Sequence, residues 1–454
     1  MLNKCVLISA KGGMKLYNWH EDYKSRLCSP RDAVKLIKSG DNVVFGHCAA
    51  EPGILVKAMI DNAEAYRGVK ISHMQTMGDG LYTRPEYKDN FKFDGWFLSP
   101  GTRDSVAQGH GDMTPNFYHE APEWIRNGIW DVDVLLTTVS LPDKRGFVSC
   151  GVSADYTREG INKAKKVIVQ VNENMPYTFG DTLVPISRFD AIVEANAPLP
   201  ELIPQAIDEK ELAIGRYCAS LIPDGATISL GIGAIPDAIC QALYDKKELG
   251  VHSDMFSDGI VDLYEAGIIT NNLKSMDKGK MIVSFVMGTK KLYQFVDRNP
   301  VVEFKDAEYA NHPYMVAKQS KMVCINSAVS VDFMGQIVSA SIGRCQFSGA
   351  GGQPSLMRGV SMSRDRQGKG IIAMTASVQD ISGKIVSRIR PYIPEGSEVS
   401  LVREDTDYVI TEYGIARLKG LPLSERARVL INIADPQFSD ELKEEYEKRF
   451  LRQF

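Results

Sequence analysis

The stretch CASLIPDGATISLGIGAIPDAICQAL, residues 218–243, decides the fold predicted here, because residues 33–59, AVKLIKSGDNVVFGHCAAEPGILVKAM, have the same layout. Each stretch runs from Leu-Ile to a glycine, then through a short apolar strand to a second glycine. A loop of small residues, a proline and apolar residues at helical spacing follow. With one gap, three pairs align: Leu36 with Leu221, Gly46 with Gly231 and Pro52 with Pro236.

This likeness leaves two explanations open. Any helix–strand–loop–helix unit has such a layout, or the chain contains an internal duplication. We favour the duplication, which predicts an α/β protein of two similar open α/β domains. Further strand-like runs at 165–173, 280–288 and 370–376 fit this pattern. Residues 196–215 contain three prolines and no strand pattern. The predicted domains are therefore 1–200 and 201–454.

The charge and hydropathy of the chain argue against two classes of partner. Its 454 residues include 53 basic and 57 acidic ones, a net charge of -4, so no basic excess indicates nucleic-acid binding. No run approaches the roughly 20 apolar residues of a membrane span. The first apolar run, of about five residues, is shorter than the roughly 7–15 of a secretory signal. Met14 is an alternative start to Met1. We expect neither a nucleic-acid nor a membrane partner.

The eight cysteines are isolated from one another in the sequence. None forms a C-x-x-C pair, so neither a zinc knuckle nor a thioredoxin-like redox motif is indicated. Scattered single cysteines in a long chain favour a reducing compartment over a disulfide framework. We therefore predict a cytoplasmic protein without a bound metal.

The first glycine loop of interest is LGIGAIPDAI, residues 230–239. It follows a predicted strand and leads into a helix, where backbone N–H groups and the helix N-terminus favour an anion. A dinucleotide-binding fingerprint is the rival interpretation, because Asp254 lies about twenty residues further on. Pro236 occupies the position of the third glycine, and the stretch before Asp254 is a poor hydrophobic strand. The dinucleotide interpretation is therefore disfavoured.

A second glycine loop, FSGAGGQPS, covers residues 347–355. Four small residues in a row let a ligand lie directly on the backbone. A flexible surface turn is the alternative. The loop lacks the acidic residues common in solvated turns, which favours a ligand-binding role.

Four carboxylates gather in LGVHSDMFSDGIVDLYEAGIIT, residues 249–270. Asp258 and Gly259 are predicted to form a turn. Asp262 and Glu265 fall on a short amphipathic helix, where they would be solvated or paired. Asp254 is flanked by Val251 to Ser253 and by Met255 and Phe256, an apolar context near a strand end. Both a structural role and covalent catalysis stay open for it.

Several long motifs together carry a family resemblance. They are GIGAIPDAI, GVHSDMFSDGIVDLYEAG, MVCINSAVSVDFMGQIVS, FSGAGGQ and, near the C-terminus, DYVITEYGIARLKG with ERARVLINIADPQF. In this order they resemble the acetyl-CoA hydrolase/transferase family of CoA-transferases. The resemblance runs from about Leu16 to Phe450, almost the whole chain.

The resemblance implies a ping-pong CoA-transferase that acts on a short-chain acyl-CoA and a free carboxylate such as acetate, butyrate or 4-hydroxybutyrate. It implies coenzyme A as substrate and covalent carrier, no metal, a homodimer and an active site between two α/β domains. The family's nucleophile is a glutamate, which becomes a glutamyl-CoA thioester. The matching residue is Asp254, a departure that puts full activity in doubt. An acyl-CoA hydrolase and an impaired CoA-binding protein are the alternatives.

The other implied site residues match the family's pattern directly. His47 belongs to the acyl pocket, although by itself it would equally fit a core histidine. Two loops are implied to bind CoA and the developing oxyanion. They consist of Gly231, Ile232, Gly233, Ala234 and Ile235, and of Ser348, Gly349, Ala350, Gly351 and Gly352.

Overall fold

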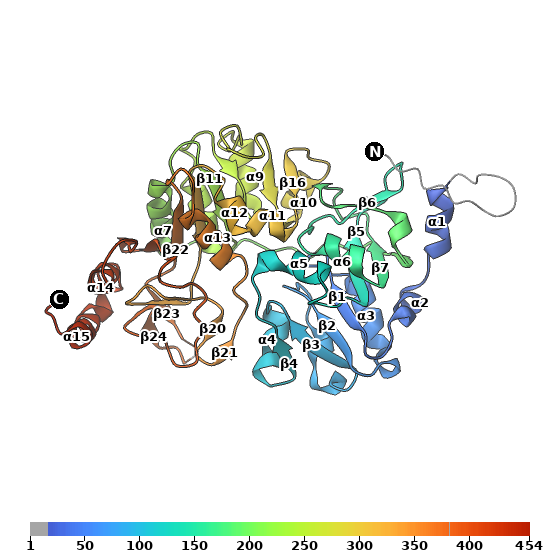
Figure 1. Ribbon diagram of the computed structural model, residues 1–454, viewed down its shortest axis with the longest axis horizontal. Helices are drawn as coiled ribbons and strands as arrows, with labels where there is room; N and C mark the ends of the chain where they lie inside the picture. Colours follow the sequence, from blue (N-terminus) through green and yellow to red (C-terminus); the bar gives the residue numbers. More distant parts are fainter. Residues whose placement is uncertain (1–16, 381) are drawn as a thin grey trace.

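Two parallel sheets organise the molecule, one in each half of the chain (Figure 1). A computed structural model describes residues 17–380 and 382–454. The alternative start at Met14 lies outside these residues. Among the described residues, no helix is long and apolar enough to cross a membrane.

The first sheet has the order β10-β7-β5-β1-β2-β3-β4, and all its strands are parallel. Its strands, in chain order, are β1 (Asn42–Phe45), β2 (Val69–Ser72), β3 (Phe91–Gly95), β4 (Gly111–Met113), β5 (Val134–Val139), β7 (Lys166–Val171) and β10 (Ala191–Glu194).

The second sheet has the order β12-β11-β17-β22-β26-β27, and only its edge strand β27 is antiparallel. Its strands are β11 (Thr227–Leu230), β12 (Gly250–Val251), β17 (Met322–Asn326), β22 (Lys369–Ala373), β26 (Tyr408–Thr411) and β27 (Gly414–Arg417).

Five strands of each sheet follow one common plan. If β1 is matched to β11, the order β2-β1-β5-β7-β10 corresponds to β12-β11-β17-β22-β26. In both halves the first strand lies between the second strand and a later one, β5 in the first sheet and β17 in the second, which places a topological switch point beside its carboxyl end. The predicted α/β class with two similar open sheets is therefore confirmed. The domain boundary at 200/201 stays a prediction. Residues 195–208 between the sheets form no regular element before α7 (Glu209–Leu221).

Helices cover both faces of each sheet. Along β17, Val323 and Ile325 pack with α7, whereas Met322 and Cys324 pack with α12 (Pro313–Val316) and α13 (Gln353–Ser361). In the first sheet, α3 (Gly53–Asp61) covers one face, and α5 (Ala121–Arg126) and α6 (Thr157–Lys163) cover the other. Strands buried on both faces have continuous apolar runs, as these do.

The remaining helices connect or flank the sheets. They are α1 (Trp19–Arg26), α2 (Pro30–Ala33), α4 (Pro100–Ala107), α8 (Ala234–Gln241), α9 (Asp258–Glu265), α10 (Lys290–Val296), α11 (Ala307–Asn311), α14 (Leu423–Ile431) and α15 (Ser439–Phe450). Helices α14 and α15 lie at the end of the molecule next to the C-terminus, far from α1 (Figure 1).

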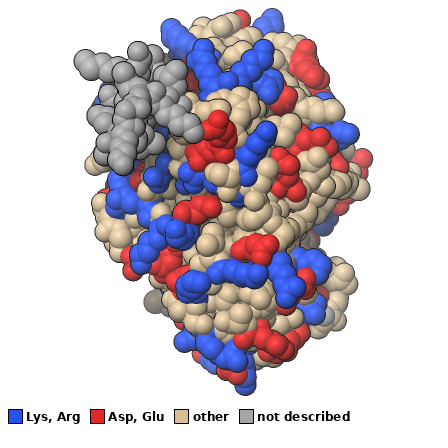
Figure 2. Space-filling view, turned by 90° about the vertical axis from the view of Figure 1, so that its right-hand side faces the viewer, with Lys and Arg blue, Asp and Glu red and all other residues tan. Residues whose placement is uncertain are grey.

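One small sheet joins the two halves, and another lies within the second half. Strand β8 (Phe179–Gly180) of the first half pairs with β16 (Val302–Phe304), which also pairs with β14 (Met281–Val283). Strand β13 (Met255–Phe256) pairs with β15 (Phe285–Val286). The run predicted as one strand at 280–288 is therefore two short strands, β14 and β15, in different sheets. Lys and Arg alternate with Asp and Glu over the face shown in Figure 2, without a patch of one sign.

Candidate active site

A cavity of about 320 Å³ lies between the two domains, at the carboxyl ends of their central strands. The first domain contributes His47, which follows β1, and Met74 and Gln75, which follow β2. The second domain contributes Gly231 and Ile232 after β11, Asp254 and Met255 beyond β12, and residues 348–353. The site therefore occupies the switch point of the second sheet, where α/β folds generally bind ligands.

Asp254 lies between β12 and β13 with its backbone fixed. Its carbonyl oxygen accepts hydrogen bonds from the N–H groups of Ser284, at 2.9 Å, and Phe285, at 3.1 Å. Its carboxylate accepts one from Met255 N at 2.9 Å and one from Ser253 Oγ at 3.3 Å. Desolvation raises the pKa of the Asp254 carboxyl, and these hydrogen bonds, with the neighbouring Asn311 amide, oppose that shift.

The loop Phe347–Gln353 touches this carboxylate. A Cβ built on Gly352 would collide with Asp254 Oδ2 and would lie 2.5 Å from Asn311 Nδ2. Glycine is therefore required here for close approach of backbone to carboxylate. The loop is anchored on the first domain, because Arg103 of α4 donates to the Phe347 carbonyl at 2.7 Å and stacks on its ring. A Cβ at Gly349 would lie 3.1 Å from the Phe97 ring.

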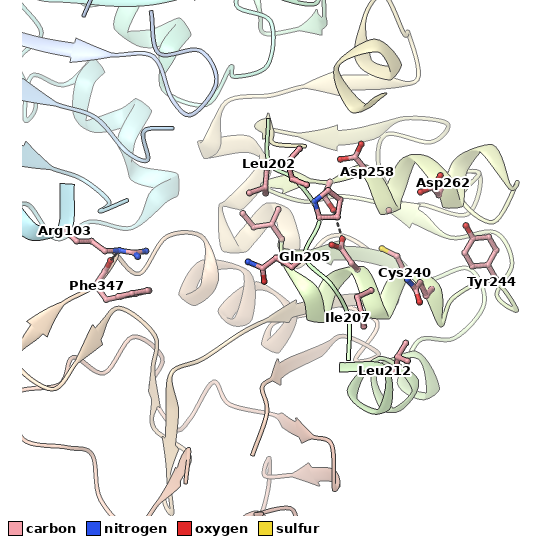
Figure 3. A pocket seen from close by; sticks show the side chains of 18 residues that line it. Arg103, Leu202, Gln205, Ile207, Leu212, Cys240, Tyr244, Asp258, Asp262 and Phe347 are labelled. Carbon is pink, nitrogen blue, oxygen red and sulfur yellow. Dashed lines mark hydrogen bonds between the residues drawn. The ribbon is translucent and has the colours of Figure 1, made fainter. Parts of the chain in front are cut away.

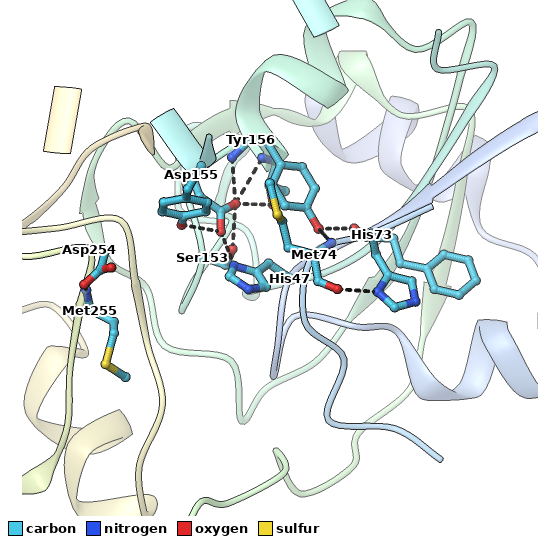
Figure 4. A network of polar contacts seen from close by, with 11 residues as sticks. His47, His73, Met74, Ser153, Asp155, Tyr156, Asp254 and Met255 are labelled. Carbon is cyan, nitrogen blue, oxygen red and sulfur yellow. Dashed lines mark hydrogen bonds and ion pairs between the residues drawn. The ribbon is translucent and has the colours of Figure 1, made fainter. Parts of the chain in front are cut away.

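His47 reaches the cavity from the opposite domain. Its side chain is buried, and its Nδ1 makes a hydrogen bond with the fully buried Asp155 (Figure 4). Its ring centroid is 4.4 Å from that of Phe285. Asp155 thus orients the imidazole from behind, while the ring faces the cavity that contains Asp254.

A larger cavity of about 930 Å³ adjoins the first (Figure 3). Ile232 lines both cavities, and Phe347 of the larger one is followed directly by Ser348 of the smaller one. The two cavities are therefore neighbours at Ile232 and at the Phe347–Ser348 step of the loop. Gly231 and Gly233 leave space there, because a Cβ on either would have no atom within 4 Å.

The structure brings most of the predicted site residues together. Asp254, His47, Gly231, Ile232 and the five residues Ser348–Gly352 line the smaller cavity. Gly233 lines the larger one. Ala234 and Ile235 line neither, because they begin helix α8, and Ile235 packs against the core. The role of each residue stays a prediction.

Of the carboxylates that follow Asp254 in the sequence, Asp258 lies in a different element from the one predicted. Asp258 and Gly259 do not form a free turn. They begin α9, and the Asp258 carboxylate accepts hydrogen bonds from Thr289 N and Oγ1 at 2.9 and 2.5 Å. Ser257, in extended backbone, is the N-cap of α9, so the helix includes Asp258. As predicted, Asp262 and Glu265 are exposed on this helix, where both pair with Lys291.

Four residues near the site were not predicted from the sequence: Asn311, Tyr118, Phe285 and Asp155. Asn311 and Phe285 come from segments without a local motif. Asp155 stands in GVSADYT, a run that looks like an ordinary helix start. Among the described residues, no group of three or more His, Cys, Asp or Glu side chains is placed to hold a metal ion.

Comparison with known proteins adds to this geometry. The N-terminal domain of the acetyl-CoA hydrolase/transferase family matches residues 13–204, and the C-terminal domain of that family matches residues 288–446. A 4-hydroxybutyrate coenzyme A transferase from Clostridium kluyveri is 48% identical over 95% of this chain and 100% of its own length. A butyryl-CoA:acetate CoA-transferase from Anaerostipes caccae is 36% identical over 95% of this chain and 98% of its own.

A solved structure agrees with these relatives. The crystal structure of a 4-hydroxybutyrate CoA-transferase from Porphyromonas gingivalis superposes with a TM-score of 0.81 and is 37% identical. It covers 95% of this chain and 100% of that one.

Proposed function

This chain belongs to the acetyl-CoA hydrolase/transferase family, and from that premise we propose that it transfers CoA through Asp254 between a short-chain acyl-CoA and a free carboxylate. It is a CoA-transferase of the 4-hydroxybutyrate and butyrate–acetate type. The observation that supports the role of Asp254 is its buried carboxylate, which lines the small cavity and lies against the backbone at Gly352.

The carboxylate of Asp254 is suited to nucleophilic catalysis because its surroundings oppose full stabilisation of its charge. Burial raises its pKa, and a carboxylate that is poorly solvated is more nucleophilic than one in water. Two hydrogen bonds to Oδ1 fix its direction, whereas Oδ2 faces Gly352. Oδ2 is therefore the oxygen that we assign to attack on the substrate.

The reaction that follows balances without a proton. An Asp254 oxygen attacks the thioester carbonyl, the C–S bond breaks, and a mixed anhydride and a CoA thiolate form. The thiolate then attacks the Asp254 carbonyl carbon and expels the first carboxylate. The incoming carboxylate reverses both steps and leaves as the new thioester, while Asp254 is regenerated. The N–H groups of the Ser348–Gly352 loop are the nearest donors for the oxyanions of these steps.

The two cavities fit the two parts of the substrate. The small cavity, of about 320 Å³, suits a short acyl group, and the junction of the two cavities at Ile232 suits the narrow pantetheine arm. The larger cavity then receives the rest of CoA. A Cβ on Gly231 would enter the room that this placement needs.

A covalent trapping experiment tests this assignment. The enzyme is incubated with acetyl-CoA without an acceptor, digested at low pH and analysed by mass spectrometry. We expect a CoA adduct on the peptide that contains Asp254 and none in Asp254→Ala. Transfer of CoA to butyrate with an adduct on another residue would contradict the role of Asp254. Absence of any transfer would contradict the function itself.

Hydrolysis is the second candidate, and the length of Asp254 favours it. Aspartate is one methylene shorter than glutamate, which leaves room beside the carboxylate for a water molecule that Asp254 can activate. Thiol release without an acceptor, measured beside CoA transfer to acetate, gives the ratio of the two activities. Thiol release without any transfer would make the protein a hydrolase.

We further propose that the enzyme works in the cytoplasm as a homodimer, in the fermentation of short-chain acids, with no nucleic-acid or membrane partner. The names of the relatives, which include butyrate and acetate, support the substrates. Light scattering at micromolar concentration tests the dimer, and a monomer mass would contradict it.

A further inference from the structure

Asp155 is fully buried, it contacts two residues that line the small cavity, His47 and Tyr118, and the proposed transfer steps do not use it. We propose that Asp155 is a positioning residue that fixes His47 as the cation that receives the free carboxylate substrate. This inference rests on the proposed function, because it names the subsite for one of the two substrates.

The hydrogen bonds of Asp155 fix its orientation. Oδ1 accepts from Ser153 Oγ at 3.0 Å, from Tyr156 N at 2.7 Å and from both the N and the Oγ1 of Thr157. Oδ2 accepts from Tyr118 Oη at 3.2 Å and from His47 Nδ1. Carboxylate oxygens accept hydrogen bonds, so the His47 Nδ1 that faces Oδ2 carries a proton.

His47 in turn is the sole possible counter-charge in the small cavity. The described side chains that line it include the Asp254 carboxylate but neither lysine nor arginine. A free carboxylate entering a buried site beside a second carboxylate needs a cation. With Nδ1–H held by Asp155, the second ring nitrogen, Nε2, is the atom of His47 that can donate to the substrate.

The charges alternate over the two half-reactions. In the free enzyme Asp254 is ionised, the acyl-CoA thioester is neutral, and His47 balances Asp254. In the enzyme–CoA thioester Asp254 is neutral, and the incoming carboxylate substrate brings the negative charge. A cation at His47 thus balances Asp254 in the free enzyme and the carboxylate substrate in the enzyme–CoA thioester. The buried Asp155 balances that cation when neither of these carboxylates faces it.

Several titratable groups surround His47 besides Asp155. Tyr118 begins the short 3-10 helix before α5, Tyr156 precedes α6, His73 follows β2, and Cys48 is the next residue in the loop of His47. Burial raises the pKa of both tyrosines and of Cys48 and lowers the pKa of His73 to about 4, so all four are neutral near pH 7. Asp254 is the one facing group whose charge changes during the reaction.

Asp155→Asn separates positioning from support of the fold. Four donors surround Oδ1, so the amide oxygen of the variant stays there, and its NH₂ group faces His47 Nδ1. Nδ1 must then accept a hydrogen bond, which leaves a neutral imidazole with its proton on Nε2. We expect the KM for acetate to rise about tenfold to a hundredfold, the range of a hydrogen bond to a charged group. The KM for acetyl-CoA should change less than threefold.

Two further variants make the result decisive. Ser153→Ala removes a hydrogen bond to the same carboxylate but leaves the contact with His47, so a purely structural role predicts equal damage from both substitutions. In the His47→Ala background, Asp155→Asn should change the KM for acetate by less than twofold. The pH profile adds a readout, because Asp155→Asn removes a buried negative charge beside His47. The pH dependence of activity toward acetate should therefore change in Asp155→Asn and stay that of the unmodified enzyme in Ser153→Ala.

The outcomes separate this inference from the proposed function. If the unmodified enzyme transfers CoA and Asp155→Asn keeps its KM for acetate and its pH profile, the positioning role is wrong. Equal losses in Ser153→Ala, or additive losses with His47→Ala, would also overturn it. If the unmodified enzyme transfers no CoA, the proposed function fails first.

Discussion

The two domains contribute residues to the site from equivalent positions. The arrangement is crossed: where one domain has a polar residue, the other has an apolar one. Gly46 aligns with Gly231, so His47 of the first domain corresponds to Ile232 of the second. Ile71 pairs with Val43 and Val251 with Ile228 at matching registers, so the residues three further on, Met74 and Asp254, also correspond. All four line the same cavity. Each domain thus supplies one polar and one apolar residue. The polar residue follows the first strand in the first domain and the second strand in the second domain.

The aligned glycines differ in the same way. A Cβ on Gly46 would collide with Thr137 and lie 2.7 Å from the Ala50 carbonyl oxygen, whereas a Cβ on Gly231 would meet no atom within 4 Å. One glycine permits close packing, and the other leaves room for a ligand. An aligned sequence position therefore does not imply one physical role. In the proposed mechanism the first domain provides a rigidly held histidine, and the second provides the nucleophile and space.

The largest effect is expected when the carboxylate of the second domain is lengthened. Relative to glutamate, Asp254 withdraws its carboxylate by one methylene, and a misplacement of roughly 1 Å can cost about a hundredfold in rate. Asp254→Glu should therefore raise turnover by about a hundredfold while the KM for acyl-CoA changes less. Steady-state kinetics with acetate and butyryl-CoA measures both.

The same variant should lower the ratio of hydrolysis to transfer, because the longer side chain fills the room left for water. Thiol release without an acceptor gives that ratio. Unchanged turnover together with an unchanged ratio would mean that the nucleophile is another residue, and the crossed arrangement would lose its main support.

The glycine loop should show the next largest effect. In Gly352→Val the new side chain takes the place of Asp254 Oδ2 and of the Asn311 amide, so the carboxylate must move. We expect turnover to fall about tenfold to a hundredfold in a variant that still unfolds cooperatively. Gly53→Val is the matched control, because Gly53 lies at an exposed helix start with no atom near its Cβ position. Normal turnover in Gly352→Val would remove the loop from the mechanism.

The sequence predicted the frame of this site because its signals are local. The strand–glycine–loop–helix layout of residues 33–59 and 218–243 needs no long-range information, and it predicted both sheets. Asp254 and His47 were found because each lies in a motif next to a strand end. Asp155 and Asn311 act through contacts more than 50 residues away along the chain, so their neighbourhood holds no trace of that role. Asp258 was misplaced because Asp-Gly is common both in turns and at helix starts.

The paired glycines allow a direct test of the two roles. Gly46→Ala should lower the free energy of unfolding by about 1–3 kcal/mol, because the added methyl group overpacks the contact with Thr137 and Ala50. Gly231→Ala should leave stability unchanged. Its methyl group enters the room assigned to the substrate, and about 1 kcal/mol of lost contact raises the KM for acyl-CoA about fivefold. Urea unfolding and kinetics on both variants decide this, and the opposite pattern would reverse the two assignments.

The smallest effect concerns the stability that the nucleophile costs. Burial raises the pKa of Asp254 in the folded state, so folding favours its protonated form. The ionised side chain therefore destabilises the fold at pH values above this raised pKa, and the penalty disappears below the unfolded pKa, where both states are protonated. Asp254→Asn keeps the oxygen that accepts from Met255 N and carries no charge. Its melting temperature should exceed that of the unmodified protein by about 1–2 °C near pH 8, and the difference should vanish toward pH 3–4. Calorimetry across this range measures it. A gain that persists at low pH would trace the effect to packing, and a loss at pH 8 would show that the charge of Asp254 is stabilised by a partner in the folded state.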